Sequence, residues 1–490
     1  MRRVMRDLLK RARMAVPVAF GAVACLMGCT GGPADPSAAT VPVVEGLPDT
    51  VTFAHVAPII RSHCTGCHRP GQVGPFPLTS YNDVRRKAKT VRKMVVGRWM
   101  PPWPADTAYS RFLGERTLNA RQIATIAKWV DQGALAGDTS ALPPLPAFPI
   151  GPATGVLPAM GPPDAVVWLP DTFHIRGDNR DRFIITKAPF ELERDTFLRA
   201  VEFVPGNRRY AHHMNGAMVS YAEGAKRDVA AGAAYINADS TRSLDAFAEL
   251  LLQNDDGTWP VLTPNLVNYL PGLSPPIYPP GIGGYRLPRK GAFLLNTMHY
   301  GPSMRDTTDR SRFNLWYGAV PPQRPMKELF LGTLGSSPVV PELVVPPDTV
   351  MTFRTSLRVP ADISVLSINP HLHLLGKSFL AYAVSPAKDT IPLIRIPDWD
   401  FRWQYAYTFP YMLHLPRNAV IHVEVVMDNT SANPNNPYDP PRTALAPKGR
   451  HMRTTDEMLQ FFVNYVDYRP GDEQISLDTR SAGPVAGAPR

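Results

Sequence analysis

The sequence predicts a multidomain fold, in which a small all-α domain at residues 49–140 is followed by two all-β antiparallel sandwich domains with a jelly-roll-like topology. Three observations predict this arrangement. The chain has 490 residues, which is too long for one hydrophobic core. Apolar residues recur at helical spacing before residue 140, and short alternating strands follow from residue 165. A run rich in proline, glycine and alanine separates the two textures.

The overall charge gives little reason to expect a nucleic-acid partner. The formal net charge is +10, but the first thirteen residues alone carry six lysines and arginines against one aspartate. The remainder is only mildly basic, which is too little to predict nucleic-acid binding. Hydrophobic residues make up 44% of the chain and charged residues 19%, as is ordinary for a folded soluble protein.

The first residues predict export and a lipid anchor. A basic start is followed by an apolar stretch over 14–27, and Leu26-Met27-Gly28-Cys29 resembles a bacterial lipobox. We expect residues 1–29 to be a lipoprotein signal and Cys29 to be acylated, with a plain signal peptide cut nearby as the alternative. A transmembrane anchor is disfavoured because the apolar run is short. The protein is then expected on the periplasmic side of the bacterial cell envelope, held to a membrane by lipid, with residues 30–48 as a flexible tether.

Three helices are predicted in the segment 49–140. The first begins near Val51 and leads to His63, and the second spans about 81–96. The third is the best marked, because Asn119 and Gln122 form a capping box and Gly133 can end the helix. Residues 141–164 form the proline-rich linker.

Short strands separated by turn residues fill the rest of the chain. Because strands at such spacing are typical of antiparallel sandwiches, we expect one sandwich over 165–325, a second over 326–472 and a tail over 473–490. The clearest strand candidates are 183–185, 197–204, 293–300, 364–368 and 420–427.

The motif Cys64-Thr65-Gly66-Cys67-His68 predicts one covalently bound haem c with His68 as an axial ligand. A zinc knuckle would need a second cysteine pair, and a thioredoxin-like motif would need a βαβ context. The chain has four cysteines, and the other two are Cys25 in the signal and Cys29, so none is left for a disulfide. Three helices around this motif resemble a class I cytochrome c domain.

The sixth haem ligand is predicted to be Met100. It lies in Arg98-Trp99-Met100-Pro101-Pro102, where prolines make the loop stiff, and a thioether there would raise the haem potential. Met94 is the competitor, but it falls in a helical run, where methionine usually belongs to the core.

A second set of candidate metal ligands lies far downstream. In His371-Leu372-His373 the alternate imidazoles would share one face of a strand, and Pro370 places them at an edge or a strand end. Neighbouring His212 and His213 would point oppositely on a regular strand, so joint binding requires a bulge or an irregular backbone. Met458 alone would be interpreted as a core methionine.

Four short motifs together resemble the copper type II, ascorbate-dependent monooxygenases, the family of the peptidylglycine- and dopamine-hydroxylating enzymes. They are His212-His213-Met214, His299-Tyr300-Gly301, His371-x-His373-x-x-Gly376 and Thr455-Asp456-Glu457-Met458, in family order over about residues 165–470. The resemblance implies that His212, His213 and His299 hold an electron-transfer copper. It implies that His371, His373 and Met458 hold the catalytic copper.

Two departures from the family argue against peptide amidation. Amidating members have an arginine two residues before the first histidine of the H-x-H pair, and a tyrosine four residues after the methionine. The corresponding residues here are Asn369 and Phe462, so the charged fork and the phenolic donor for a substrate carboxylate are missing.

The resulting functional hypothesis is an exported copper-dependent monooxygenase with one haem and two coppers. It would hydroxylate a C–H bond of a small organic substrate with O₂, and the haem would pass electrons from a periplasmic or quinol-linked donor to the copper held by the histidines at 212, 213 and 299. The alternative is a non-catalytic periplasmic electron-transfer or copper-handling protein on the same fold.

Overall fold

Four helices lie in the first part of the chain and pack on a shared cluster of buried residues. They are α1 (Phe53–His63), α2 (Tyr81–Arg86), α3 (Ala88–Val96) and α4 (Ala120–Asp131). The predicted capping box is confirmed, since the Asn119 side chain accepts a hydrogen bond from the Gln122 N–H. The single helix predicted over 81–96 is wrong in one respect, because it is interrupted at Lys87 and forms α2 and α3.

The computed structural model describes residues 40–478 except 141, 143, 146–159, 239, 242, 274, 319 and 448–453. The predicted signal segment with Cys29 lies outside the described residues, as do most of the predicted linker and the end of the predicted tail. Among the described helices, none is long and apolar enough to span a membrane.

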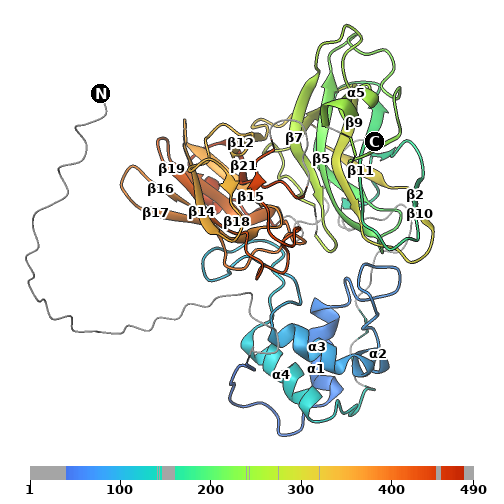
Figure 1. The fold of residues 1–490 in the computed structure, drawn as a ribbon, viewed down its shortest axis with the longest axis vertical. Coiled ribbons are helices and arrows are strands. Elements are labelled where there is room, and N and C mark those ends of the chain that lie inside the picture. The colour runs from blue at the N-terminus through green and yellow to red at the C-terminus, as the bar shows by residue number, and fades with distance from the viewer. Residues whose placement is uncertain are drawn as a thin grey trace, which may run out of the picture. The chain divides into compact units, whose positions relative to one another are not determined.

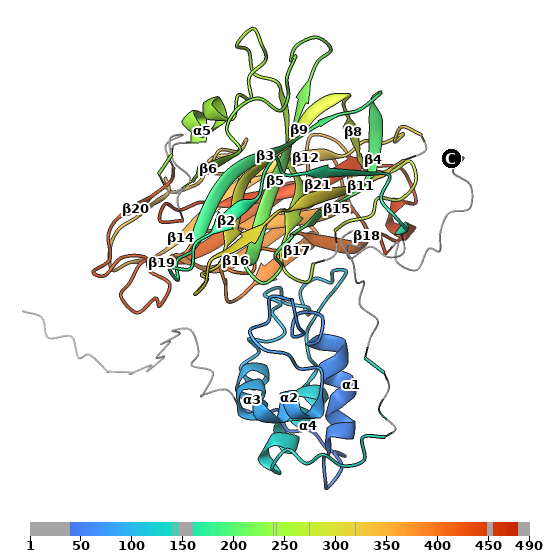
Figure 2. The ribbon, with the colours of Figure 1, turned by 90° about the vertical axis from the view of Figure 1, so that its right-hand side faces the viewer.

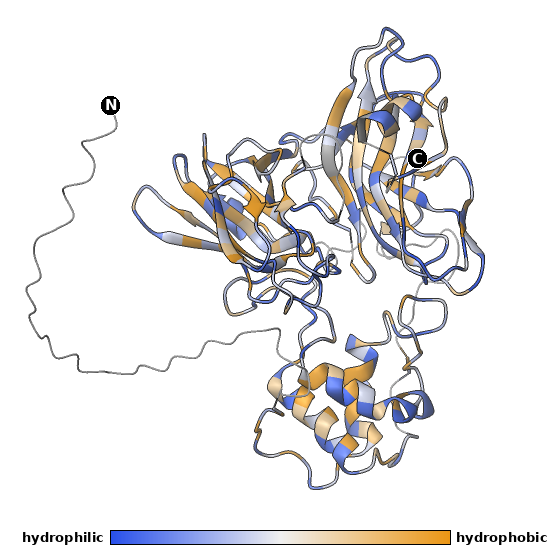
Figure 3. Cartoon of the chain, in the orientation of Figure 1, coloured by the Kyte–Doolittle hydropathy of each residue, from blue (hydrophilic) through white to orange (hydrophobic). Residues whose placement is uncertain are grey.

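The helical core is built from the apolar faces that the periodicity marks. Val56, Ile60, Ile126 and Trp129 are almost completely buried against one another. Polar atoms at its edge are paired, since the Trp129 indole N–H donates to the Leu135 carbonyl at 2.9 Å. Figure 3 shows the apolar faces of α1, α3 and α4 turned inward.

Two main sheets follow, and their facing sides share one core. The five-stranded antiparallel sheet has the order β6-β3-β9-β5-β7, and the four-stranded antiparallel sheet has the order β1-β11-β4-β8. Phe293 on β9 and Phe313 on β11 stack at 4.5 Å in that core. The bounds of these strands are β1 (Ala165–Trp168), β3 (Arg182–Glu191), β4 (Thr196–Val204), β5 (Ala211–Tyr221), β6 (Tyr235–Asn237), β7 (Val261–Tyr269), β8 (Tyr285–Leu287), β9 (Lys290–Tyr300) and β11 (Arg312–Tyr317).

Two further four-stranded antiparallel sheets lie in the last part of the chain, with the orders β12-β21-β15-β18 and β14-β19-β16-β17. They share a second core, in which Phe353, Phe379 and Phe461 are fully buried. Figures 1 and 2 show these strands in orange and red. Their bounds are β12 (Lys327–Gly332), β14 (Val350–Arg358), β15 (Ile363–His371), β16 (Gly376–Val384), β17 (Thr390–Ile396), β18 (Tyr407–Leu415), β19 (Val420–Asp428) and β21 (Gln460–Asp467).

Small elements complete the described structure. Strands β2 (Phe173–Ile175) and β10 (Thr307–Asp309) form one two-stranded sheet, and β13 (Val344–Val345) and β20 (Ala444–Leu445) form another. The short helices are α5 (Ser243–Glu249) and the 3₁₀ turn η2 (Asp472–Gln474).

The predicted fold class is wrong. The described part of the chain is mostly β, with 35% in strands and 11% in helices, and no small all-α cytochrome domain is apparent. The physical reason lies in the segment after α3, where Ala105 and Phe112 are buried in the core of the last sheets. The Leu113 N–H also donates to the Thr408 carbonyl at 2.8 Å. Helical periodicity marks α1–α4 but says nothing about such long-range packing.

The second core predicts where a truncation is costly. Phe353 on β14 is 0% exposed, whereas Val350 on the same strand is 50% exposed. We expect Phe353→Ala to lower the free energy of unfolding by about 3–5 kcal/mol, because it removes a buried ring and leaves a cavity. Val350→Ala should change the free energy of unfolding by less than about 0.5 kcal/mol. Urea denaturation of both variants measures this, and equal losses would contradict the assigned core.

Candidate metal centres

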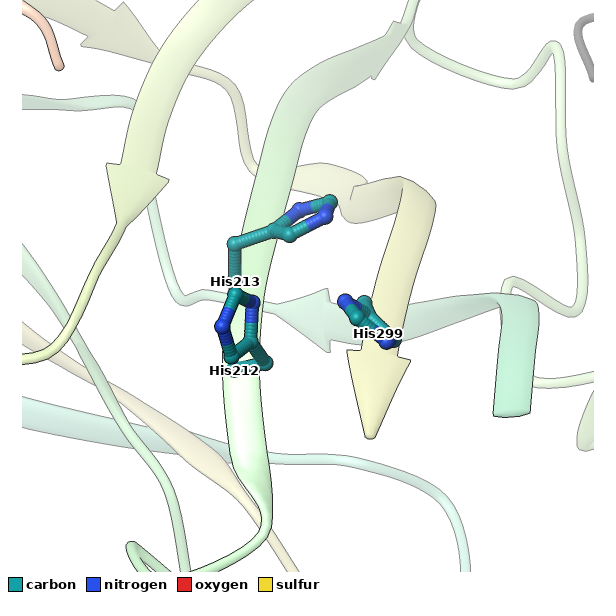
Figure 4. A group of neighbouring side chains, drawn as sticks. All are labelled: His212, His213 and His299. Atoms are coloured by element: carbon teal, nitrogen blue, oxygen red, sulfur yellow. The ribbon is translucent and has the colours of Figure 1, made fainter. Parts of the chain in front are cut away.

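Three histidines from two neighbouring strands meet at one point of the five-stranded sheet. His212 and His213 lie on β5 and His299 lies on β9, where His213 and His299 are register partners. The pairing of β5 with β9 is irregular between Ala211 and His213, so the regular alternation of side chains is broken there. The backbone irregularity that joint binding requires is therefore present. It lets both neighbouring imidazoles turn toward His299, as Figure 4 shows.

The geometry of this three-histidine cluster fits a metal ion. One ring nitrogen from each histidine lies within 4.8 Å of the others. The buried atoms His212 Nδ1, His213 Nε2 and His299 Nδ1 have no hydrogen-bond partner among the described residues. Buried polar atoms are nearly always paired, so three unpartnered nitrogens in one histidine cluster need an explanation. A metal ion that accepts three imidazole lone pairs provides one.

An acidic side chain orients the cluster from outside. The His299 Nε2–H donates to Asp181 Oδ1 at 2.6 Å, which leaves Nδ1 as the lone-pair nitrogen. The hydrogen bond from His299 lowers the pKa of the Asp181 carboxyl, so it stays ionised. Phe183 stacks on the His299 ring at 4.3 Å and fixes its plane. Nothing in the four motifs marks Asp181, and sequence reasoning missed it.

Burial keeps the imidazoles in the form that binds metals. Burial lowers the pKa of His212 to about 4. Burial, followed by the neighbouring histidines, lowers the pKa of His213 well below its ordinary value. Neutral imidazole is the ligand form, so protons compete weakly for this cluster near neutral pH.

The structure also brings His371, His373 and the neighbourhood of Met458 together. His371 ends β15, and His373 lies beyond the strand, with the two ring centroids 5.0 Å apart. The predicted strand end is confirmed, whereas a regular strand carrying both imidazoles is not formed. Met458 is buried two residues before Gln460, the register partner of His371 on β21. Burial lowers the pKa of His371 to about 3.

A buried carboxylate, Glu457, ties these residues to one another. It accepts the backbone N–H groups of Leu375 at 2.7 Å and His373 at 3.2 Å, and that of Met458 as well. The His373 Nδ1–H donates to the Asp456 carbonyl at 2.7 Å, which leaves Nε2 as the lone-pair nitrogen. Burial raises the pKa of Glu457 to about 8, against these hydrogen bonds. Sequence reasoning missed this role, although a charged residue directly before Met458 was a signal.

An aromatic residue lies between the two histidine clusters. The Phe401 ring centroid is 6.3 Å from that of His213 and 5.8 Å from that of His373. The charges of His371 and His373 also act on the pKa of His213, as their proximity requires. The two clusters therefore face one another across one side chain.

The cysteine motif forms a single turn at the end of α1. The N–H groups of Cys67 and His68 both donate to the Cys64 carbonyl, at 3.2 and 2.9 Å. Cys64 and Cys67 are free thiols and partly exposed. The His68 Nδ1–H donates to the Phe76 carbonyl at 3.0 Å, so Nε2 is the lone-pair nitrogen. Two adjacent thiols with an oriented imidazole fit covalent haem attachment.

The two methionine candidates lie close along the chain. Met94 is in α3, and Met100 is half-buried in the turn that follows, where its N–H donates to the Met94 carbonyl at 3.2 Å. Assignment of Met100 as the sixth ligand stays a prediction.

Two clefts share Val73 in their lining. One is small, with about 30 Å³ of room for water-sized molecules, and is lined by Cys67, Val73, Arg208 and Tyr269, among others. The second, about 1270 Å³ including its open mouth, is lined by Val73 and His212, among others. Cys67 and His212 therefore line neighbouring clefts.

Comparisons with known proteins do not assign the chain to a family. No family model and no curated protein matches the sequence. Among solved structures, a chain from the atomic structure of Sulfolobus Turreted Icosahedral Virus aligns with a TM-score of 0.17 and 8% identity, over 66% of this chain and 92% of that one. A TM-score this low carries no argument about fold or function.

Because Asp181 orients the His299 ring, we expect a substitution of Asp181 to weaken metal binding. We expect Asp181→Asn to weaken Cu(II) binding about 10–100-fold, because the carboxylate that fixes the His299 tautomer becomes a neutral amide. The matched control is Asp178→Asn, since Asp178 pairs with Arg182 and not with a histidine. Competition titration with a copper chelator measures both affinities. Equal affinities in the two variants would contradict the assigned role of Asp181.

Proposed function

We propose that the protein is an exported haem–copper oxidoreductase, an O₂-dependent monooxygenase that hydroxylates a C–H bond of a small organic substrate. The observation that carries the proposal is the set of three buried, unpartnered ring nitrogens of His212, His213 and His299. A structural role for these histidines would leave three polar atoms buried without partners. A bound metal satisfies all three.

The two clusters differ in ligand chemistry, and this difference supports a division of labour. His212, His213 and His299 would hold one copper through imidazoles, which suit a centre cycling between Cu(I) and Cu(II). His371, His373 and Met458 would hold a second copper, and the soft thioether favours Cu(I). Copper at these sites supplies single-electron transfer and activation of O₂.

The protein's own groups orient the ligands. Asp181 fixes the His299 ring, and the Asp456 carbonyl fixes that of His373. Glu457 holds the His373 and Met458 backbones by accepting their N–H groups, which sets the spacing between imidazole and thioether.

The haem would be joined to Cys64 and Cys67 and ligated by His68 through Nε2. Haem c supplies electrons one at a time, which suits copper centres that accept single electrons. The electrons would come from a periplasmic or quinol-linked donor, which matches the expected export and lipid anchoring through Cys29.

The two positions that would hold a substrate carboxylate in peptide-amidating enzymes are occupied by uncharged residues in this protein. Asn369 and Phe462 are register partners on β15 and β21, and both are buried. Phe462 stacks on Phe330 at 4.4 Å. A neutral amide and a phenyl ring offer no charged fork, so we propose a substrate that is not anchored there by a carboxylate.

Met458→His separates the two copper sites. We expect the variant to bind copper but to lose most O₂-dependent product formation, because a harder ligand favours Cu(II). The measurement is O₂ uptake together with hydroxylated product, over a panel of small organic substrates. Met351→His, at a partly buried position of β14 that packs against the core of the last sheets, is the control for a histidine replacing methionine elsewhere.

Product formation at the wild-type rate in Met458→His would place the catalytic copper elsewhere. Wild-type protein that binds both coppers but couples no O₂ uptake to product would favour the alternative, a non-catalytic electron-transfer or copper-handling protein.

Met100→Ala tests the sixth haem ligand. We expect loss of the weak near-infrared band of methionine-ligated ferric haem and a lower midpoint potential, since the thioether stabilises Fe(II). Met94→Ala is the matched control and should leave the band in place. Loss of the band in Met94→Ala instead would exchange the two assignments.

A further inference from the structure

One segment lies against both histidine clusters and against the loop that carries Met100. The residues 399–405, Trp-Asp-Phe-Arg-Trp-Gln-Tyr, connect β17 to β18 and contain four aromatic rings. No metal-ligand motif marks the segment. Its neighbours are the loop after α3, the three-histidine cluster and the second histidine pair.

The end of the segment at Tyr405 contacts the haem-binding part of the chain. The Tyr405 hydroxyl donates to the Pro102 carbonyl at 3.1 Å, and its ring centroid lies 5.6 Å from that of Trp103. Both contacts come from the loop that carries Met100.

Trp403 continues from Tyr405 to the histidines. The rings of Tyr405 and Trp403 are stacked, with centroids 6.1 Å apart and planes at 13°. The Trp403 ring lies 6.4 Å from that of His212 at 39°. A row of three rings (tyrosine, tryptophan and imidazole) thus runs from the loop that carries Met100 to the three-histidine cluster. Tyr405 is fully buried, and the partly buried Trp403 packs against the same core.

We propose that Tyr405 and Trp403 are the electron-transfer bridge between the haem at Cys67 and the copper at His212. The inference rests on the proposed function, because it assumes that both redox groups are bound. With both groups bound, one electron would pass from ferrous haem to cupric ion, so that iron would become ferric and copper cuprous. No bond forms or breaks and no proton moves. Burial holds the pKa of Tyr405 above its usual range, which keeps the phenol protonated.

The rings act as a bridge and are not themselves oxidised. Their π-systems offer a closely spaced path between two groups that the chain holds on different elements. The same segment continues to Phe401, which touches His213 and His373. One short segment therefore contacts both histidine clusters and the loop that carries Met100.

The test is intramolecular electron transfer in the holoprotein. A ruthenium photoreductant reduces the haem in protein loaded with Cu(II), and reoxidation of the haem is followed optically. We expect Trp403→Leu to slow reoxidation about tenfold, because the aliphatic side chain leaves a gap in the row of rings. Trp403→Phe should restore most of the rate.

Trp399→Leu is the matched control, because it removes a buried indole from the same segment that packs on Phe379 and not on a histidine. We expect its rate to equal that of wild type. Copper affinity, the copper paramagnetic resonance spectrum and the haem midpoint potential are measured for each variant. Unchanged values show that Trp403→Leu alters the path and not the two ends.

The outcomes separate this inference from the proposed function. Wild-type haem that is not reoxidised by bound Cu(II) would overturn both. Fast wild-type transfer that is unchanged in Trp403→Leu, or slowed equally in Trp399→Leu, would overturn the bridge alone.

Discussion

The three-histidine cluster depends on the irregular pairing of β5 with β9. A regular antiparallel ladder would send His212 and His213 to opposite faces of the sheet. The register shift between Ala211 and His213 lets both rings approach His299, and the result is three buried nitrogens without hydrogen-bond partners. Leaving such atoms buried costs free energy, about 1–3 kcal/mol for each. A metal ion at this point relieves the cost and gives the distorted strand a function.

Hydrogen bonds to residues that are not proposed as metal ligands hold both clusters in place. Asp181 reaches His299 from outside the sheet, and Glu457 gathers three N–H groups around the His373 turn. Burial lowers the pKa values of His212 and His371, and neighbouring imidazoles would repel one another if they were protonated. The low pKa values therefore follow from the packing. Phe401 then fills the space between the clusters and leaves them facing each other across one ring.

The sequence predicted local features better than the arrangement of the parts. The cap at Asn119, the strand end near Pro370 and the bulge at His212 follow from residue chemistry, and the structure has all three. The separate all-α domain was wrong, because burial of Phe112 in a core built from residues more than two hundred positions later leaves no local signal.

The same limit applies to the candidate site. Histidine motifs identified His212, His213, His299, His371 and His373, but not the groups that orient or connect them. Asp181 and Trp403 become recognisable only when β3 and the segment before β18 are placed beside the histidines. Such residues carry no motif, because their role is set by spatial neighbours and not by sequence neighbours.

The central claim is that the three unpartnered nitrogens bind copper. Anomalous X-ray scattering at the copper absorption edge, from crystals of the holoprotein, tests it most directly. We expect one peak within bonding distance of His212 Nδ1, His213 Nε2 and His299 Nδ1. We expect a second peak beside His371, His373 and Met458. Crystals saturated with copper that show no peak among the three histidines would contradict it.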